Sequence, residues 1–310
     1  MRAEHALAGL LALCLAGAAA ARDVVFVLGE DAPGRTPFHG VAREYFRATR
    51  PSEALVSGAR SLAEVREHLV RHHDGQPWDE VIVVVHGAPW VGLHVPVFAD
   101  GPEATLSALE HAAASGEFPP LPVGTLSDAG IIRLESCGLG LRPDYLAAFG
   151  RLFSDARGRP AMVLASEAFV AYRAGSAPAR AELPFASAVV AGDDPAALAA
   201  AGEGLAAELA HAPGQRSRDV VETVPIAISM TLAVQPGRRL PSPARAAASD
   251  PAVARRLRDH RLDPGELAWR SRREGDHVLQ VEGRATLVLR RPRFDAQVFT
   301  PRPLTTARGD

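Results

Sequence analysis

The sequence predicts an α/β protein with a three-layer, doubly wound and mainly parallel sheet, followed by a smaller C-terminal α+β accessory region. Short apolar and β-branched runs alternate with stretches of helical periodicity over 23–172. Two of these runs, at 81–85 and 131–135, stop abruptly before His-Gly and Ser-Cys-Gly, which is typical of buried strands that end at a sheet edge. Beyond Pro213 the pattern changes to two long strand-like segments, which indicates a separate region.

The elements before the first His-Gly pair follow from turn and capping residues. In order, we expect a strand at 23–28, a loop at 30–40, a helix at 41–50, a strand at 54–56, a helix from 61 to about 73 and a strand at 81–85. Gly29 closes the first strand, and Pro51 stops the first helix because proline cannot continue the helical hydrogen bonds. Ser61 with Glu64 three residues later forms the capping-box pattern that begins the second helix.

The next elements continue the alternation. We expect an irregular hairpin at 91–98, a helix at 103–115, a strand at 131–135, a helix at 143–153, strands at 161–165 and 168–172, and a helix at 194–211. Gly92 and Pro96 interrupt the first of these segments, so it is expected beyond the sheet edge. Pro143 suits the first position of a helix, and Asp194 suits an N-cap.

The C-terminal accessory region is expected to span 216–310, after an α/β domain at 22–215. It holds strands at 220–234 and 277–289, separated by a Pro/Ala/Ser-rich stretch and an Arg-rich helix at 252–261. We interpret the arginines of that helix as a solvated face.

Composition and a predicted targeting segment argue against two kinds of partner, nucleic acid and a membrane that holds the mature protein. The chain has 310 residues, of which 47% are hydrophobic and 23% charged, and its formal net charge is −2, so a nucleic-acid partner is not expected. Residues 1–21 predict a signal peptide, with Arg2 before a short apolar stretch and small residues at its end. The mature protein is therefore expected in the periplasm or secreted, without stable membrane insertion. Cys14 lies in the signal, which leaves Cys137 as the only mature thiol.

A nucleophile and a base are expected at two strand ends. His86 follows one buried run and Cys137 follows another, 51 residues later, which leaves room for one crossover between parallel strands. In parallel α/β sheets the carboxyl edge of the strands is where ligands bind. His86 could populate a Cys137 thiolate, and the backbone N–H groups of Gly87 and Cys137 could hold an oxyanion.

These motifs, Val83-Val84-Val85-His86-Gly87 and Leu134-Glu135-Ser136-Cys137-Gly138, resemble those of the caspase-like cysteine peptidases, which include caspases, legumains, clostripain and gingipains. In caspases the histidine also precedes the cysteine by about 50 residues. The resemblance implies a caspase-like fold, hydrolysis of a peptide or protein substrate, His86 as general base and Cys137 as nucleophile. Gly87 and Cys137 would form the oxyanion hole. No metal or organic cofactor is implied.

The resemblance also suggests residues near the substrate. Glu135 would be structural or would shape the specificity pocket. Trp90 follows the His-Gly pair closely, where the family pattern differs, and we consider it for substrate binding. Arg173 follows the strand after the nucleophile strand and could pair with an acidic substrate residue.

Two other functions remain open. In a serine α/β-hydrolase, Ser136 would be the nucleophile on a strand-to-helix elbow, although Leu134 is bulky for the position two residues before it. In a non-catalytic binding scaffold with the same fold, Cys137 would be a buried small residue.

Overall fold

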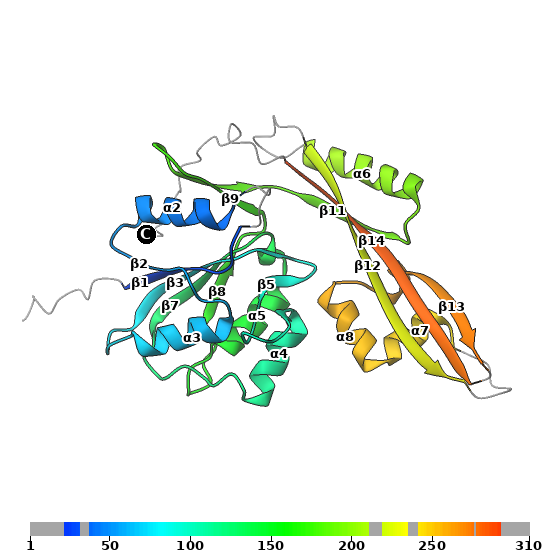
Figure 1. Ribbon diagram of the computed structural model, residues 1–310, viewed down its shortest axis with the longest axis horizontal. Coiled ribbons are helices and arrows are strands. Elements are labelled where there is room, and N and C mark those ends of the chain that lie inside the picture. The colour runs from blue at the N-terminus through cyan, green and yellow to red at the C-terminus, as the bar shows by residue number, and fades with distance from the viewer. Residues whose placement is uncertain (1–21, 32–36, 211–218, 235–240, 276, 293–310) are drawn as a thin grey trace, which may run out of the picture.

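A computed structural model describes residues 22–31, 37–210, 219–234, 241–275 and 277–292. It is an α/β structure with a five-stranded parallel sheet beside an antiparallel C-terminal sheet (Figure 1). The described residues form seven α-helices. The predicted signal peptide at 1–21 lies outside the described residues. No helix in the described ranges is long and apolar enough to span a membrane.

The parallel sheet has the order β2-β1-β3-β7-β8, and every neighbouring pair runs parallel. Its strands are β1 (Asp23–Val27), β2 (Ala54–Val56), β3 (Trp78–Val84), β7 (Leu126–Glu135) and β8 (Met162–Ala165). All five predicted strands of this sheet are confirmed, although β3 and β7 begin earlier than predicted, at Trp78 and Leu126. β1 and β3 carry mostly valine, isoleucine and phenylalanine, which suit a sheet buried on both faces.

Alternate residues of the sheet face two different apolar clusters. Val24, Val81 and Val83 face one cluster, which contains α3 (Leu62–Arg71), α4 (Leu106–Ser115) and α5 (Pro143–Leu152). Val25, Ile82 and Val84 face the other, which contains α2 (His39–Thr49) and β9 (Phe169–Arg173). The sheet is therefore covered on both sides, as a layered α/β fold requires.

The helix starts follow the capping residues of the sequence. Ser61 Oγ accepts the Glu64 backbone N–H at 3.2 Å, so Ser61 is the N-cap of α3 as predicted. Pro143 is the first residue of α5. The helix predicted at 103–115 begins later, at Leu106, because Thr105 is its N-cap and Glu103–Ala104 form β6.

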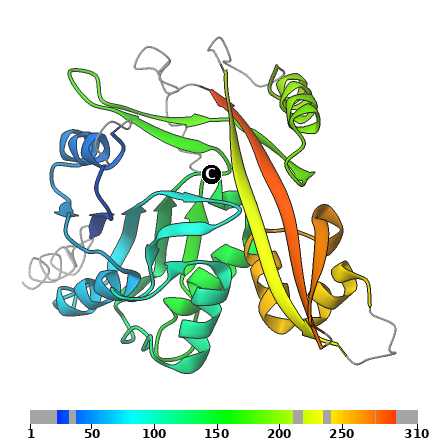
Figure 2. The ribbon, with the colours of Figure 1, turned by 45° about the vertical axis from the view of Figure 1, so that its right-hand side comes forward.

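Two small β-structures lie beyond the parallel sheet. β4 (Gly87–Ala88), β5 (Gly92–Pro96) and β6 pair antiparallel directly after β3, where the irregular hairpin was predicted. β9 and β10 (Ala179–Leu183) form an antiparallel hairpin that reaches across to α2 (Figure 2). Tyr172 of this hairpin packs against Phe38, Tyr45 and Phe46.

The C-terminal sheet has the order β11-β14-β12, with β13 also paired to β14. Its strands are β11 (Ala186–Ala191), β12 (Asp219–Ala233), β13 (Ala268–Glu274) and β14 (Val278–Pro292). The helices of this region are α6 (Pro195–Ala210), α7 (Pro243–Ser249) and α8 (Pro251–Asp259). Strand pairing therefore assigns β11 to the C-terminal sheet, before the expected division at 215/216. Part of the Pro/Ala/Ser-rich stretch forms α7, with Ser242 as its N-cap.

The buried side chain of Arg142, a residue that is only 1% exposed, links the parallel-sheet region to α8 of the C-terminal region. Its guanidinium donates to the Pro89 carbonyl at 2.5 Å and to the Asp259 carbonyl at 3.3 Å, and it pairs with Asp144. Asp259 in turn accepts the Ser107 backbone N–H at 2.8 Å. These bonds connect the segment after His86 to both α4 and α8.

Candidate functional site

The strands that carry His86 and Cys137 are neighbours. β3 and β7 pair in parallel register up to Val84 and Glu135, and the Val85 backbone N–H donates to the Glu135 carbonyl at 3.3 Å. The strand pairing ends at Val84 and Glu135, and each candidate residue, His86 or Cys137, lies two residues beyond that point. The predicted base and nucleophile thus follow adjacent strand ends at the carboxyl edge of one sheet.

Cys137 lies beneath β9. The residue is 7% exposed, and its Sγ donates to the Val170 carbonyl at 3.9 Å. Burial raises the pKa of the Cys137 thiol to about 11. In this conformation the sulfur is therefore protonated at neutral pH, and a nucleophilic thiolate would need the covering strand to move.

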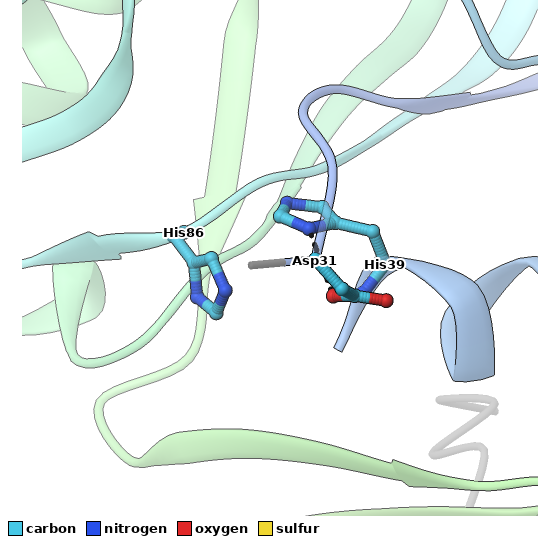
Figure 3. A group of neighbouring side chains, drawn as sticks. All are labelled: Asp31, His39 and His86. Atoms are coloured by element: carbon cyan, nitrogen blue, oxygen red, sulfur yellow. Dashed lines mark hydrogen bonds and ion pairs between the residues drawn. The ribbon is translucent and has the colours of Figure 1, made fainter. Parts of the chain in front are cut away.

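His86 is exposed and lies against the segment that leads into α2. Its ring stacks on Phe38, with centroids 4.5 Å apart, and meets His39 edge to face, with centroids 4.7 Å apart. Asp31 lies in the same group (Figure 3). Asp31, His39 and His86 are the described residues that could hold a metal ion, because each offers a ligand atom to a common point.

Asp31 supplies the cap that α2 otherwise lacks. Phe38, the N-cap residue, makes no capping bond with its side chain. Asp31 instead accepts the backbone N–H groups of Phe38, His39 and Gly40 at 2.7–2.8 Å, and its Oδ1 lies 3.2 Å from His39 Nδ1. Burial opposes ionisation of this carboxyl, but the three backbone hydrogen bonds outweigh it and lower the pKa of Asp31 to about 2.

Asp31 and His39 were not predicted as site residues, because residues 30–40 were predicted only to form a loop. One signal was present, since both residues follow a strand that pairs in parallel with β3. Polar residues after any strand of a parallel sheet share its carboxyl edge, whatever their distance in sequence.

Glu135 holds the β9–β10 hairpin over this edge. Its buried carboxylate accepts Arg180 Nε–H at 2.7 Å and the Tyr172 hydroxyl at 3.0 Å. Burial and the neighbouring Glu135 carboxylate raise the pKa of Tyr172 well above its ordinary value, so Tyr172 remains a hydrogen-bond donor. These contacts give Glu135 a structural role beneath the hairpin.

Trp90 and Arg173 also make contacts within the protein. Trp90 is 9% exposed and belongs to the apolar cluster of the C-terminal sheet, and its carbonyl lies 3.0 Å from His260 Nδ1. Arg173 Nε donates to the Ala177 carbonyl at 3.1 Å across the β9–β10 turn. Trp90 thus connects the sheet edge to the C-terminal region, and Arg173 stabilises the hairpin turn.

Gly87 and Ser136 pack directly against each other. A Cβ at position 87 would lie 2.4 Å from Ser136 Oγ and 2.7 Å from the Gly92 carbonyl, so this close approach requires glycine. Ser136 is fully buried, and its Oγ has no hydrogen-bond partner among the described residues. In this conformation no base of the described residues is therefore hydrogen-bonded to Ser136, the nucleophile of the serine-hydrolase alternative.

The two residues predicted to donate backbone N–H groups to an oxyanion, Cys137 and Gly87, lie in different hydrogen-bonding surroundings. Within the described ranges, the Cys137 N–H makes no hydrogen bond, whereas the next N–H, of Gly138, donates to the Ala168 carbonyl at 3.0 Å. Gly87 lies in β4 and pairs with Leu93.

Comparison of the chain with protein-family models, with curated proteins and with solved structures found no match.

Proposed function

We propose that this protein is an exported, caspase-like cysteine peptidase in which Cys137 is the nucleophile and His86 the general base. The observation that carries the proposal is the pairing of β3 with β7, which brings both residues to one sheet edge in register. The strand-His-Gly and Glu-Ser-Cys-Gly motifs support it through their resemblance to that peptidase group. The export part of the proposal rests on the signal-like sequence at 1–21.

The chemistry would proceed through an acyl-enzyme. The Cys137 thiolate attacks the scissile carbonyl carbon, and the backbone N–H groups of Gly87 and Cys137 stabilise the oxyanion. His86 then gives the proton that it took from the thiol to the leaving amine as the C–N bond breaks. A water molecule hydrolyses the thioester, which releases the acid and restores the thiol.

The described conformation would be a latent form of this enzyme. Cys137 is covered by β9, and the bonds of Glu135 to Tyr172 and Arg180 hold β9 and β10 in place. Substrate access therefore requires the hairpin to move. Removal or displacement of the hairpin should both uncover the sulfur and lower its pKa, because burial is what raises it.

Peptide hydrolysis by matched variants tests the proposal. We expect turnover of a peptide library, before and after limited proteolysis, to fall at least about 100-fold in Cys137→Ala and His86→Ala. His94→Ala, which removes another exposed histidine on β5, should retain activity. Activity that survives Cys137→Ala but is lost in Ser136→Ala would replace the proposal with the serine-hydrolase alternative.

The burial of Cys137 favours one second candidate, a non-catalytic binding scaffold. A thiol that is 7% exposed with a raised pKa behaves as a small apolar core residue. Absence of hydrolysis under all conditions, with an unchanged fold in Cys137→Ala, would support the scaffold and contradict the peptidase.

A further inference from the structure

We propose that Asp31, His39 and His86 form a binding site for a divalent transition-metal ion, with Zn²⁺ as the best fit. The three side chains come from three places: His86 follows β3, Asp31 follows β1, and His39 is the first residue of α2 (Figure 3). Their ligand atoms all lie within 4.8 Å of one another. This inference does not depend on the proposed peptidase. The two roles of His86 exclude each other at any one time, because a ring nitrogen bound to an ion cannot accept a proton, so a bound ion would block the general base.

The distances are close to those of a metal site. Zinc bonds to nitrogen and oxygen of about 2.0–2.1 Å place two tetrahedral ligand atoms roughly 3.3 Å apart. Asp31 Oδ1 and His39 Nδ1 are already 3.2 Å apart, so an ion could replace the hydrogen bond between them. His86 is the exposed member, and its ring would have to shift toward the other two ligand atoms when an ion binds, since all three lie within 4.8 Å but not all at bonding separation.

Two of the three ligands are held in place before an ion binds. His39 is 3% exposed, and three backbone N–H groups of the α2 start fix the Asp31 carboxylate. The His39 nitrogen that faces Asp31, Nδ1, is thus already oriented toward the carboxylate before an ion binds.

The donor set selects the class of ion. Ca²⁺ and Mg²⁺ prefer sites made entirely of oxygen atoms. Two imidazoles and one carboxylate instead suit Zn²⁺ and neighbouring first-row ions, and three protein ligands leave a further coordination position open. The exposed side of His86 places that open position toward solvent.

Titration calorimetry with Zn²⁺, on the full chain without added histidines, tests the site. We expect one strong equivalent of Zn²⁺, and an affinity at least about tenfold lower in His86→Ala and in Asp31→Asn. His72→Ala is the matched control, because His68 and His72 also stack, at 4.2 Å, on α3. The control should bind Zn²⁺ like the unaltered chain.

Two results would overturn the proposal. One is the absence of saturable Zn²⁺ binding, and the other is a loss of binding in His72→Ala that His86→Ala does not show. The side-chain oxygen of asparagine can still accept hydrogen bonds from the α2 backbone in Asp31→Asn. If that variant nevertheless fails to fold, the His86→Ala variant, at an exposed residue, decides the question alone. The readout is binding, so the result stands whether or not the protein hydrolyses peptides.

Discussion

The carboxylate of Glu135 accepts a hydrogen bond from Arg180 Nε at 2.7 Å, which joins the central parallel sheet to the hairpin that covers its edge. The Glu135 side chain is 4% exposed and that of Arg180 17%. Removal of one partner of a buried pair leaves the other charge unpaired, which costs far more than loss of an exposed pair. We therefore expect this contact to oppose movement of the hairpin that covers Cys137.

Arg180→Ala should lower the free energy of unfolding by about 3 kcal/mol, because it leaves Glu135 buried without its counter-ion. Urea denaturation measures the loss. Arg173→Ala, on the same hairpin, removes a solvent-exposed hydrogen bond to the Ala177 carbonyl and should cost about 1 kcal/mol. Equal losses in the two variants would show that the ion pair is not what holds the hairpin.

Cys137 should react slowly with iodoacetamide in the folded protein. With a pKa raised from 9.0 to about 11, roughly one thiol in a thousand is ionised at pH 8, against roughly one in ten for an ordinary thiol. The rate should rise about tenfold per pH unit up to about pH 10, and peptide mapping can follow it at this residue. Fast labelling that is constant from pH 6 upward would instead reveal an activated thiolate.

The same shift should appear in the alkaline stability of the protein. The folded state holds the thiol proton more tightly than the unfolded chain, so this contribution is fully present below pH 9 and is lost as the pH rises toward 11. The free energy of unfolding of Cys137→Ala, measured by denaturation from pH 7 to 11, should therefore fall less steeply with pH than that of the unaltered protein. Parallel curves for the two proteins would contradict the raised pKa.

Glu80→Gln should destabilise the protein at neutral pH by about 2 kcal/mol, since hydrogen bonds to charged groups are the stronger ones. Glu80 accepts Arg133 Nε–H at 2.7 Å and Arg50 Nη1–H at 2.9 Å. Burial acts to raise the pKa of Glu80, but these two arginines outweigh it and lower the pKa below 4.5.

The Glu80 contribution is therefore present above pH 4.5 and is lost as the pH falls through the lowered pKa. Denaturation curves of the two proteins should converge in acid. Glu67→Gln, which breaks the exposed pair with Arg71, is the control and should change stability by less than about 0.5 kcal/mol. A Glu80→Gln effect independent of pH would mean that its charge is not responsible.

Two glycines should respond to alanine in opposite directions. Gly87→Ala forces a methyl group to within 2.4 Å of Ser136 Oγ and should cost about 2 kcal/mol or more. Gly204 lies within α6 with open space around it, so Gly204→Ala should stabilise the protein by about 0.5–1 kcal/mol. Thermal unfolding of both variants tests the pair. A neutral Gly87→Ala would show that the edge beside Ser136 can expand.

The strands and helices of the parallel sheet could be predicted because their signals are local. The β-branched runs before Gly29 and His86, the Ser61 cap and Pro143 act over a few residues of backbone. The C-terminal sheet was harder to predict. β11 and β13 have weak patterns of their own, and both depend on pairing with β14. β13 lies only a few residues before β14, whereas β11 is far from it in the chain.

The sequence by itself determined the two motifs, the alternation of strand and helix, and therefore the edge at which His86 and Cys137 emerge. Only the tertiary structure decided what surrounds them: β9 covers the sulfur of Cys137, and Asp31 and His39 approach the ring of His86 from another strand end. Local patterns specify where the backbone goes. Burial and neighbouring charge, which set the protonation and ligands of a side chain, depend on segments that only the folded chain brings together.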